Sequence, residues 1–383
     1  MLATEREASE VASAVNSICL KAWFEELLKT DKTELEIIIG ELVNVAKISQ
    51  AALEEARASL PSVSAVQWAS FATRFHLNMD PNLIFFEIGR YETPVYRLPP
   101  SFHKQIIRMS WWTQDAYRER VDQFDVAGRL RLLDPYIVPV LALFEGRLVD
   151  KHNQVLSGKA YPTGRDVPHK VCMMAGAMFI IVGTNQLYRE NDAARIFLEL
   201  FALAECNIQQ KFEGLRVYGL LTDSSRFEFY SYNPATSRFY LDQQIIVSIK
   251  RDEQAMSMIK VTNKIFSVMF TAYLDGLRSV DQADEDEQIK QWLITSPTTE
   301  KQKLTDPCRT ALELAEQSQA QFMEHAGTIR ALERKSKKAL LLLSSSVRSI
   351  PRESLYTVED EPADLEALAH YLVTKEYEEA SGT

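Results

Sequence analysis

The chain has 383 residues, of which 46% are hydrophobic and 25% are charged. These values are typical of an ordinary globular protein and exclude a fibrous or wholly disordered chain. The formal net charge is −10, so the chain lacks the overall basic excess of a dedicated nucleic-acid-binding protein.

The negative charge is concentrated in two segments. Residues 351–383 carry nine acidic and two basic side chains, a net charge of −7, and the run Asp281–Glu287 contributes a further −5. The rest of the chain therefore has a net charge of +2. An acidic average thus does not exclude a nucleic-acid partner for the folded part.

The cysteines and the apolar segments indicate a compartment. Cys19, Cys172, Cys206 and Cys308 are far apart and form no CxxC motif, which predicts buried free thiols. The charged first 14 residues lack the apolar stretch of a secretory signal, and the longest apolar run, Ala175–Val182, is too short to span a bilayer. We expect a cytoplasmic or nuclear protein without a membrane partner.

The first of three expected regions, residues 1–150, is mainly helical with a short β unit. Apolar residues recur at three- and four-residue intervals over 3–29 and 33–58, which predicts two amphipathic helices. The apolar segment Leu83–Ile88 is typical of a buried strand. Asp134–Phe144 is apolar but contains Pro139, which predicts a kinked helix or a helix start.

The second region, residues 151–280, is the expected core. Its first 20 residues are polar and rich in turn formers. A strand, a long helix and three further strands are then predicted, at Val171–Gly183, Glu190–Lys211, Leu215–Thr222, Arg226–Asn233 and Arg238–Ser248. The expected fold class is therefore α/β or α+β, with a mixed central sheet flanked by long helices. The second region ends in a helix of about 27 residues that is predicted from Asp252 and that stops at the acidic run.

The third region, residues 281–383, is an expected helical extension with an acidic tail. One further long helix is predicted over Lys303–Leu343, because a heptad-like stripe runs through it. That stripe should pack on the body, and it consists of Ala311, Ala315, Ser318, Phe322, His325, Ile329, Leu332, Ser336, Ala339 and Leu343.

Four segments carry a resemblance to a known fold. They are AMFIIVGTNQ (177–186), ENDAARIFLELFALAECNIQQKF (190–212), RVYGLLTDSSRFEFYSYNP (216–234) and VTNKIFSVMFTAYLDGLRS (261–279). In order and spacing they resemble the restriction-endonuclease-like, or PD-(D/E)xK, domain found in uncharacterised fungal proteins and crinkler-type effectors. The resemblance covers about 110 residues. It implies a strand with an E-x-K signature, then a helix that often carries a Gln, then a hairpin.

The expected catalytic residues are missing from the signature strand. The fold's chemistry uses two carboxylates to hold a divalent metal and a lysine to stabilise the attacking water. The resemblance places the Glu at Ile181 and the Lys at Gly183, and neither side chain can do this work. The sequence thus indicates a pseudoenzyme without a cofactor.

A displaced site is the alternative. It would use Mg²⁺ or Mn²⁺ held by Asp166 and Glu199, with Glu190 as a further acid and Lys170 as the base. Each residue also has a simpler interpretation. Asp166 fits a solvent-facing turn, and acids near a helix N-terminus interact favourably with the helix dipole.

Two further groups are candidate binding residues. Gln209 and Gln210 lie where the family helix often carries a Gln, although they equally fit a polar helix face. A basic cluster fits a nuclear-localisation patch, a phosphate contact or simply the charged flank of a helix; it consists of Arg330, Arg334, Lys335, Lys337 and Lys338.

Three functional hypotheses follow. The first is a non-catalytic nuclease-fold protein that serves as an intracellular binding or scaffold module, with a protein partner expected first and a nucleic acid second. The second is a nuclease that depends on Mg²⁺ or Mn²⁺. The third is a helical protein-interaction protein in which the β unit only packs the helices. The sequence favours the first, and hence no enzymatic activity.

Overall fold

The computed structural model places a large part of the unit Pro61–Thr383. The helices expected at 3–29 and 33–58 lie outside the described residues, as does the strand expected at 83–88 except for Ile88. The described residues are 68–78, 80, 88–119, 122–123, 126–150, 169–173, 178–184, 190–209, 212, 214–248, 250–282, 305–350 and 369–375.

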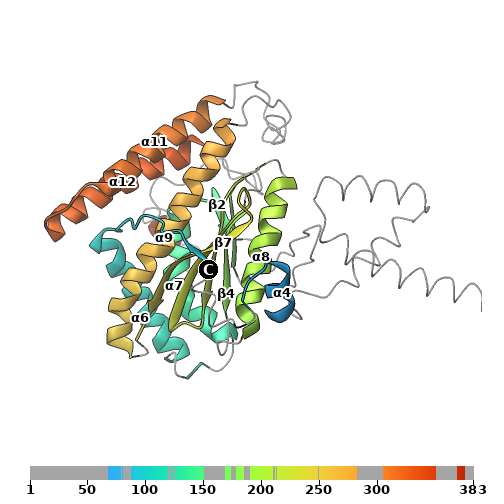
Figure 1. Cartoon of the computed structure of the whole chain (residues 1–383). Coiled ribbons are helices and arrows are strands. Elements are labelled where there is room, and N and C mark those ends of the chain that lie inside the picture. The colour runs from blue at the N-terminus through green and yellow to red at the C-terminus, as the bar shows by residue number, and fades with distance from the viewer. Residues whose placement is uncertain are drawn as a thin grey trace, which may run out of the picture. The chain divides into compact units, whose positions relative to one another are not determined.

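A mixed seven-stranded sheet lies at the centre of the described part (Figure 1). Its order is β1-β7-β6-β5-β4-β3-β2, with β1 parallel to β7, β4 parallel to β5 and the other neighbours antiparallel. The strands are β1 (Gly89–Arg90), β2 (Leu148–Asp150), β3 (His169–Met173), β4 (Met178–Thr184), β5 (Val217–Thr222), β6 (Arg226–Asn233) and β7 (Arg238–Ile246). The expected mixed α+β class is therefore confirmed.

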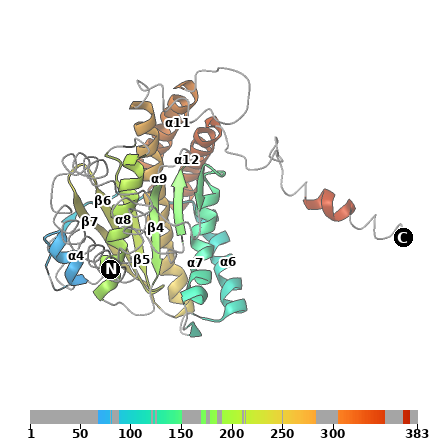
Figure 2. The same ribbon diagram turned by 90° about the vertical axis from the view of Figure 1, so that its right-hand side faces the viewer.

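Helices cover both faces of the sheet (Figure 2). The pair α4 and α8 lies on one face, and α6, α7 and α9 lie on the other. The last two helices, α11 and α12, pack outside α9 and α6. The bounds are α4 (Trp68–Arg74), α6 (Pro100–Tyr117), α7 (Val126–Ala142), α8 (Glu190–Gln209), α9 (Arg251–Gln282), α11 (Thr305–Met323) and α12 (Ile329–Ser349).

Most core elements begin and end near the predicted residues. The structure confirms the helix from Glu190, the strands β5 to β7 and the long helix α9. The single strand predicted at Val171–Gly183 was wrong, because this region forms two antiparallel strands, β3 and β4. A continuous apolar run reads as one buried strand, since no polar residue marks the turn.

The two faces of β5 serve different cores. Val217 and Leu221 pack toward α8, whereas Tyr218 and Leu220 pack toward α9, as the two-residue period of a strand requires. Gly219 faces Ile196 and Leu200 of α8, and a Cβ atom there would lie 3.2 Å from Leu200. The absence of a side chain at this position lets the helix approach the sheet.

The core on the α9 face is shared by the whole described body. This cluster of buried side chains includes residues from Tyr96 through Tyr218 and Tyr273 to Ile350. It thus draws on all three of the regions expected from the sequence, 1–150, 151–280 and 281–383. The helix α9 is buried on nearly all sides between Val261 and Leu277, as is typical of a helix at the centre of a core.

The single helix predicted over Lys303–Leu343 was also wrong. The chain forms an antiparallel pair, α11 and α12, and α12 begins after Thr328, whose side chain accepts a hydrogen bond from the Ala331 amide. The stripe packs on the body as expected through Ala311, Ala315, Phe322, Ala339 and Leu343, which belong to the shared core, whereas His325 and Ile329 are exposed. The two helices also contact each other closely. There the Ser318 hydroxyl donates to the Ala339 carbonyl at 2.7 Å. Small side chains allow this close approach.

The approach of α8 to β5 gives a first prediction. Replacement of Gly219 by Val should lower the free energy of unfolding by about 1–3 kcal/mol, because the added atoms overpack the contact with Leu200. Gly327 is the matched control, since a Cβ atom there meets nothing within 4 Å. Urea unfolding of the Gly219→Val and Gly327→Val variants measures both effects, and equal stability of the two would contradict the packing argument.

Candidate functional site

Several of the residues singled out by the nuclease resemblance lie where the structure does not describe side chains. Asp166 lies outside the described residues, and of Lys170 and Glu190 only the backbone is described. Lys170 is in β3, paired with Ile181 of β4, and Glu190 is the first residue of α8. The described residues contain no group of three or more His, Cys, Asp or Glu side chains that could hold a metal ion.

The other candidates on α8 lie apart from one another. Glu199 is buried and forms an ion pair with Arg195, one turn earlier in the same helix, at 3.4 Å. Gln209 is exposed at the last residue of α8, whereas Gln210 lies outside the described residues. Two residues that are ten positions apart in a helix are separated by about 15 Å along the helix axis. Glu199 and Gln209 therefore cannot share one site.

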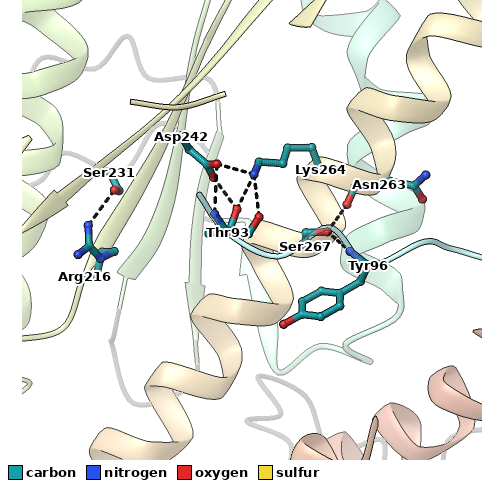
Figure 3. A network of polar contacts seen from close by, with 8 residues as sticks. All are labelled: Thr93, Tyr96, Arg216, Ser231, Asp242, Asn263, Lys264 and Ser267. Carbon is teal, nitrogen blue, oxygen red and sulfur yellow. Dashed lines mark hydrogen bonds and ion pairs between the residues drawn. The ribbon is translucent and has the colours of Figure 1, made fainter. Parts of the chain in front are cut away.

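A buried ion pair forms the centre of a polar network that sequence reasoning missed (Figure 3). The Lys264 ammonium on α9 lies 2.6 Å from Asp242 Oδ1 on β7, and each side chain is 2% exposed. The ammonium also donates to Thr93 Oγ1 at 2.7 Å and to the Thr93 carbonyl at 3.2 Å. The three donors of this ammonium are thus satisfied without water.

Thr93 and a strand irregularity complete the arrangement around Asp242. The Thr93 amide donates to Asp242 Oδ1 at 3.2 Å, and its hydroxyl donates to Oδ2. In the sheet, Phe229 pairs with Gln243 and Tyr230 pairs with Leu241, which leaves Asp242 as the extra residue of a β-bulge. Bulges commonly re-aim a side chain, and here the carboxylate meets α9.

The same face of α9 holds the segment after Thr93. The Tyr96 amide donates to Ser267 Oγ at 2.8 Å, and the Leu98 amide donates to Asn263 Oδ1 at 2.9 Å. His103 Nε2 lies 3.0 Å from the same Asn263 oxygen. Residues 91–99 form no helix or strand, so side chains of α9 supply the partners that a neighbouring strand would otherwise provide.

This network is a structural junction, because its polar groups are buried and paired. Burial lowers the pKa of the Lys264 amine, and the Asp242 carboxylate opposes that shift. The signal in the sequence was the pair of polar residues Asn263 and Lys264 within the buried part of α9. Their partners lie far away along the chain, so sequence periodicity could not identify them.

A second cluster lies at the edge of the sheet. The Arg216 guanidinium carbon lies 3.6 Å from the ring centre of Tyr91 and 4.8 Å from that of Tyr240. Arg216 also donates to Ser231 Oγ at 3.0 Å, as Figure 3 shows. Contacts of a cation with aromatic faces are favourable. They connect the two-residue strand β1, through Tyr91, to β5 and β7.

A positively charged surface feature lies along α12. Its outer face carries exposed bases at three-, four- and seven-residue spacings, with exposed Leu341 and Ser345 between them and the acidic residue Glu333 beside them. From first to last the bases span about 27 Å. We call this surface the α12 ridge, and its bases are Arg330, Arg334, Lys337, Lys338 and Arg348.

The bases of the ridge differ in whether they form ion pairs with other described residues. Lys337 forms an ion pair with Glu333 at 2.8 Å, and Arg348 forms one with Glu145 at 2.8 Å. Arg330, Arg334 and Lys338 are exposed and have no hydrogen-bond or ion-pair partner among the described residues. Lys335 does not belong to the ridge, because its ammonium donates to the carbonyls of Phe322 and Glu324 at the end of α11.

Comparisons with protein-family models, curated proteins and solved structures give no match to this chain. Among the described helices, none combines the length and the apolar character that crossing a membrane requires. Cys206 and Cys308 are buried and are not part of a disulfide bond, as expected. The case for a function therefore depends on the geometry of the chain itself.

The buried ion pair gives the second prediction. A Lys264→Met variant should lose about 3–5 kcal/mol of unfolding free energy, because the Asp242 carboxylate stays buried without its counter-charge. The double variant Lys264→Met, Asp242→Leu should lose less than the single variant. Lys250→Met is the control: its pair with Glu253 is exposed and contributes at most about 1 kcal/mol. Guanidinium unfolding measures all three.

His103 gives the third prediction. Burial lowers the pKa of its imidazole, against the opposing effect of the hydrogen bond with Asn263. As the pH falls through about 6.5, the imidazole therefore takes up a proton in the unfolded chain before it does so in the folded chain. The free energy of unfolding consequently decreases as the pH drops below about 6.5. A His103→Gln variant should show a smaller fall between pH 7 and pH 5.5. Urea unfolding across this range measures it, and identical pH slopes would contradict the prediction.

Proposed function

We propose that this chain is a non-catalytic nuclease-fold protein, and that it acts as a binding module whose α12 ridge contacts the phosphate backbone of a nucleic acid. The observation that carries the proposal is the ridge itself, with its five exposed bases on one helix face. The module needs no cofactor for this role.

The order of the elements supports the nuclease-type core. Strand β4 is followed by the long helix α8, then by β5 and the β5–β6 hairpin, which is the order that the resemblance implies. The helix α8 packs on the sheet next to β4 and β5. The central position of this mixed sheet supports the nuclease-type core over the helical interaction protein of the third hypothesis.

The composition of β4 supports the absence of cleavage. This strand reads MFIIVGT and contains no acidic residue and no lysine. The family's signature positions carry the carboxylate and the amine that hydrolysis uses, whereas this chain has Ile181 and Gly183 there. A surface for phosphate contacts depends on neither residue.

The chemistry of the ridge favours a nucleic acid over a protein partner. Interfaces between proteins are centred on aromatic or other apolar anchors, whereas the ridge offers one exposed apolar side chain, Leu341. Regularly spaced Lys and Arg side chains are the usual contacts to phosphates. The +2 charge of the chain outside its two acidic segments is compatible with such a ligand.

A protein partner is the second candidate, and a different surface favours it. On α6, Trp112 is 62% exposed, and the Arg251 guanidinium lies 3.8 Å from the ring centre of Trp111. Tryptophan and arginine are enriched among the residues that dominate binding energy. Because this surface is on α6 and the ridge is on α12, substitutions on the ridge separate the two candidates.

The fourth prediction tests the ridge. The Arg334→Glu, Lys338→Glu double variant should bind labelled duplex DNA or RNA about tenfold more weakly than the unmodified chain, and its dependence of log K on log salt should be shallower by about 2. Fluorescence anisotropy at several salt concentrations measures both quantities.

The matched control is Lys250→Glu, Lys260→Glu, which makes the same charge change at two exposed positions, one just before α9 and one within it. It should weaken binding by less than the ridge variant does. Equal losses in the two variants, or no salt-dependent binding by the unmodified chain, would overturn the proposal.

The same preparations test for cleavage. Incubation with plasmid DNA or RNA and either Mg²⁺ or Mn²⁺ should leave the nucleic acid intact. Cleavage that disappears in an Asp166→Ala variant would instead support the nuclease with displaced acids, whereas cleavage that persists in that variant would point to a contaminating enzyme.

A further inference from the structure

The α12 ridge and the acidic segment 351–383 are neighbours in the chain. The helix α12 ends at Ser349, and the acidic segment begins two residues later. It has a net charge of −7, whereas the ridge has five bases, of which Lys337 and Arg348 already form ion pairs with Glu333 and Glu145. Opposite net charges of this size attract within the Debye length of about 8 Å at physiological salt.

The length of the acidic segment allows it to reach the whole ridge. Residues 351–368 alone span up to about 60 Å when extended, and the ridge is about 27 Å long. The acidic side chains are distributed along the segment, so several can meet the bases at once. They are Glu353, Glu359, Asp360, Glu361, Asp364, Glu366, Glu376, Glu378 and Glu379.

Both the segment 351–383 and the ridge carry exposed apolar side chains in addition to their opposite charges. Residues 369–375 are helical, and their side chains Tyr371, Leu372 and Val373 are each more than half exposed. On the ridge, Leu341 is 69% exposed between the bases Lys338 and Arg348. Contact between these apolar side chains would remove their surfaces from water, which is favourable, and would add to the attraction between the charges.

We infer that the segment 351–383 folds back onto the α12 ridge of its own chain and competes there with the phosphate backbone of a nucleic acid. The docking step depends only on the ridge and the segment, whereas the competition rests on the proposed function. A tethered competitor acts at an effective concentration in the millimolar range, so even a weak contact reduces the affinity for a free ligand.

Zero-length carbodiimide cross-linking of the full-length chain tests the docking. A mixture of equal amounts of ¹⁴N- and ¹⁵N-labelled chains at low salt should give peptides that link Lys338 to carboxylates of 351–383 within one chain. The links should disappear at 1 M salt, where the Debye length is about 3 Å. Lys260, an exposed lysine of α9, is the control and should form no such link.

Neutralisation of the segment tests the competition. The variant with five tail substitutions should bind labelled duplex about tenfold more tightly than the unmodified chain, as expected for removal of a tethered competitor. Its substitutions are Glu359→Gln, Asp360→Asn, Glu361→Gln, Asp364→Asn and Glu366→Gln.

The acidic run at 281–287 supplies the matched control, because it also contains five acidic residues. Their replacement changes the net charge by the same amount and should alter the affinity by less than twofold. The control substitutions are Asp281→Asn, Asp284→Asn, Glu285→Gln, Asp286→Asn and Glu287→Gln.

The outcomes separate the two proposals. Absent links, or links found only between ¹⁴N and ¹⁵N chains, overturn the docking within one chain. An equal affinity of the tail variant and its control overturns the competition, while nucleic-acid binding itself still stands. If no variant binds nucleic acid, the proposed function and the competition both fail, and the cross-links alone decide whether the segment docks on the ridge.

Discussion

The buried pair of Lys264 and Asp242 is the interaction on which the rest of the described architecture depends. Removal of two charges from water costs several kcal/mol per ion, and only close geometry with further hydrogen bonds repays it. Here Thr93 supplies those bonds, so the pair fixes three elements at once: the bulge of β7, the helix α9 and the segment 91–99. The hydrogen bonds of Thr93 and the ion pair are directional, so they hold these elements together in a defined geometry.

The position of the α12 ridge follows from this junction. The Ser336 hydroxyl of α12 donates to the Arg97 carbonyl at 2.7 Å, and the Gln319 side chain of α11 donates to the Tyr96 hydroxyl at 2.6 Å. Both acceptors lie in the segment that α9 holds through Asn263 and Ser267. The two outer helices thus rest on a segment without regular secondary structure, and the junction keeps that segment in place beneath the ridge.

Local patterns in the sequence predicted the elements whose own residues determine them. The α8 face and the strands β5 to β7 have clear periodicities, and the turn after Thr222 has polar residues that mark it. Two predictions were wrong where no break in the residue pattern marked the boundary between two elements. The apolar run at 171–183 contains the ends of two strands, and the stripe through 303–343 kept its spacing across the turn at 324–328.

The candidate site was predictable only in part, for the same physical reason. The exposed bases Arg334, Lys337 and Lys338 could be identified because charge clustering is a local property of the sequence, but the role of Lys335 at the end of α11 required the antiparallel pairing of two helices. The Lys264 network joins residues up to 171 positions apart, and no local pattern encodes such a contact. A Lys within an apolar helix face signals that a buried partner exists, without saying where.

Recognition of a phosphate backbone and its cleavage are separable in physical terms. Phosphate contacts supply affinity and register without reading the bases, and they need only correctly spaced cations on a rigid element such as α12. Hydrolysis needs ligands for a metal in the sheet, and strand β4 has none among MFIIVGT. A fold that binds without cutting cannot release its ligand by converting it to products. An uncut ligand leaves by dissociation, and under the proposed function an anionic segment attached beside the cationic helix would lower the occupancy of that ligand by competition.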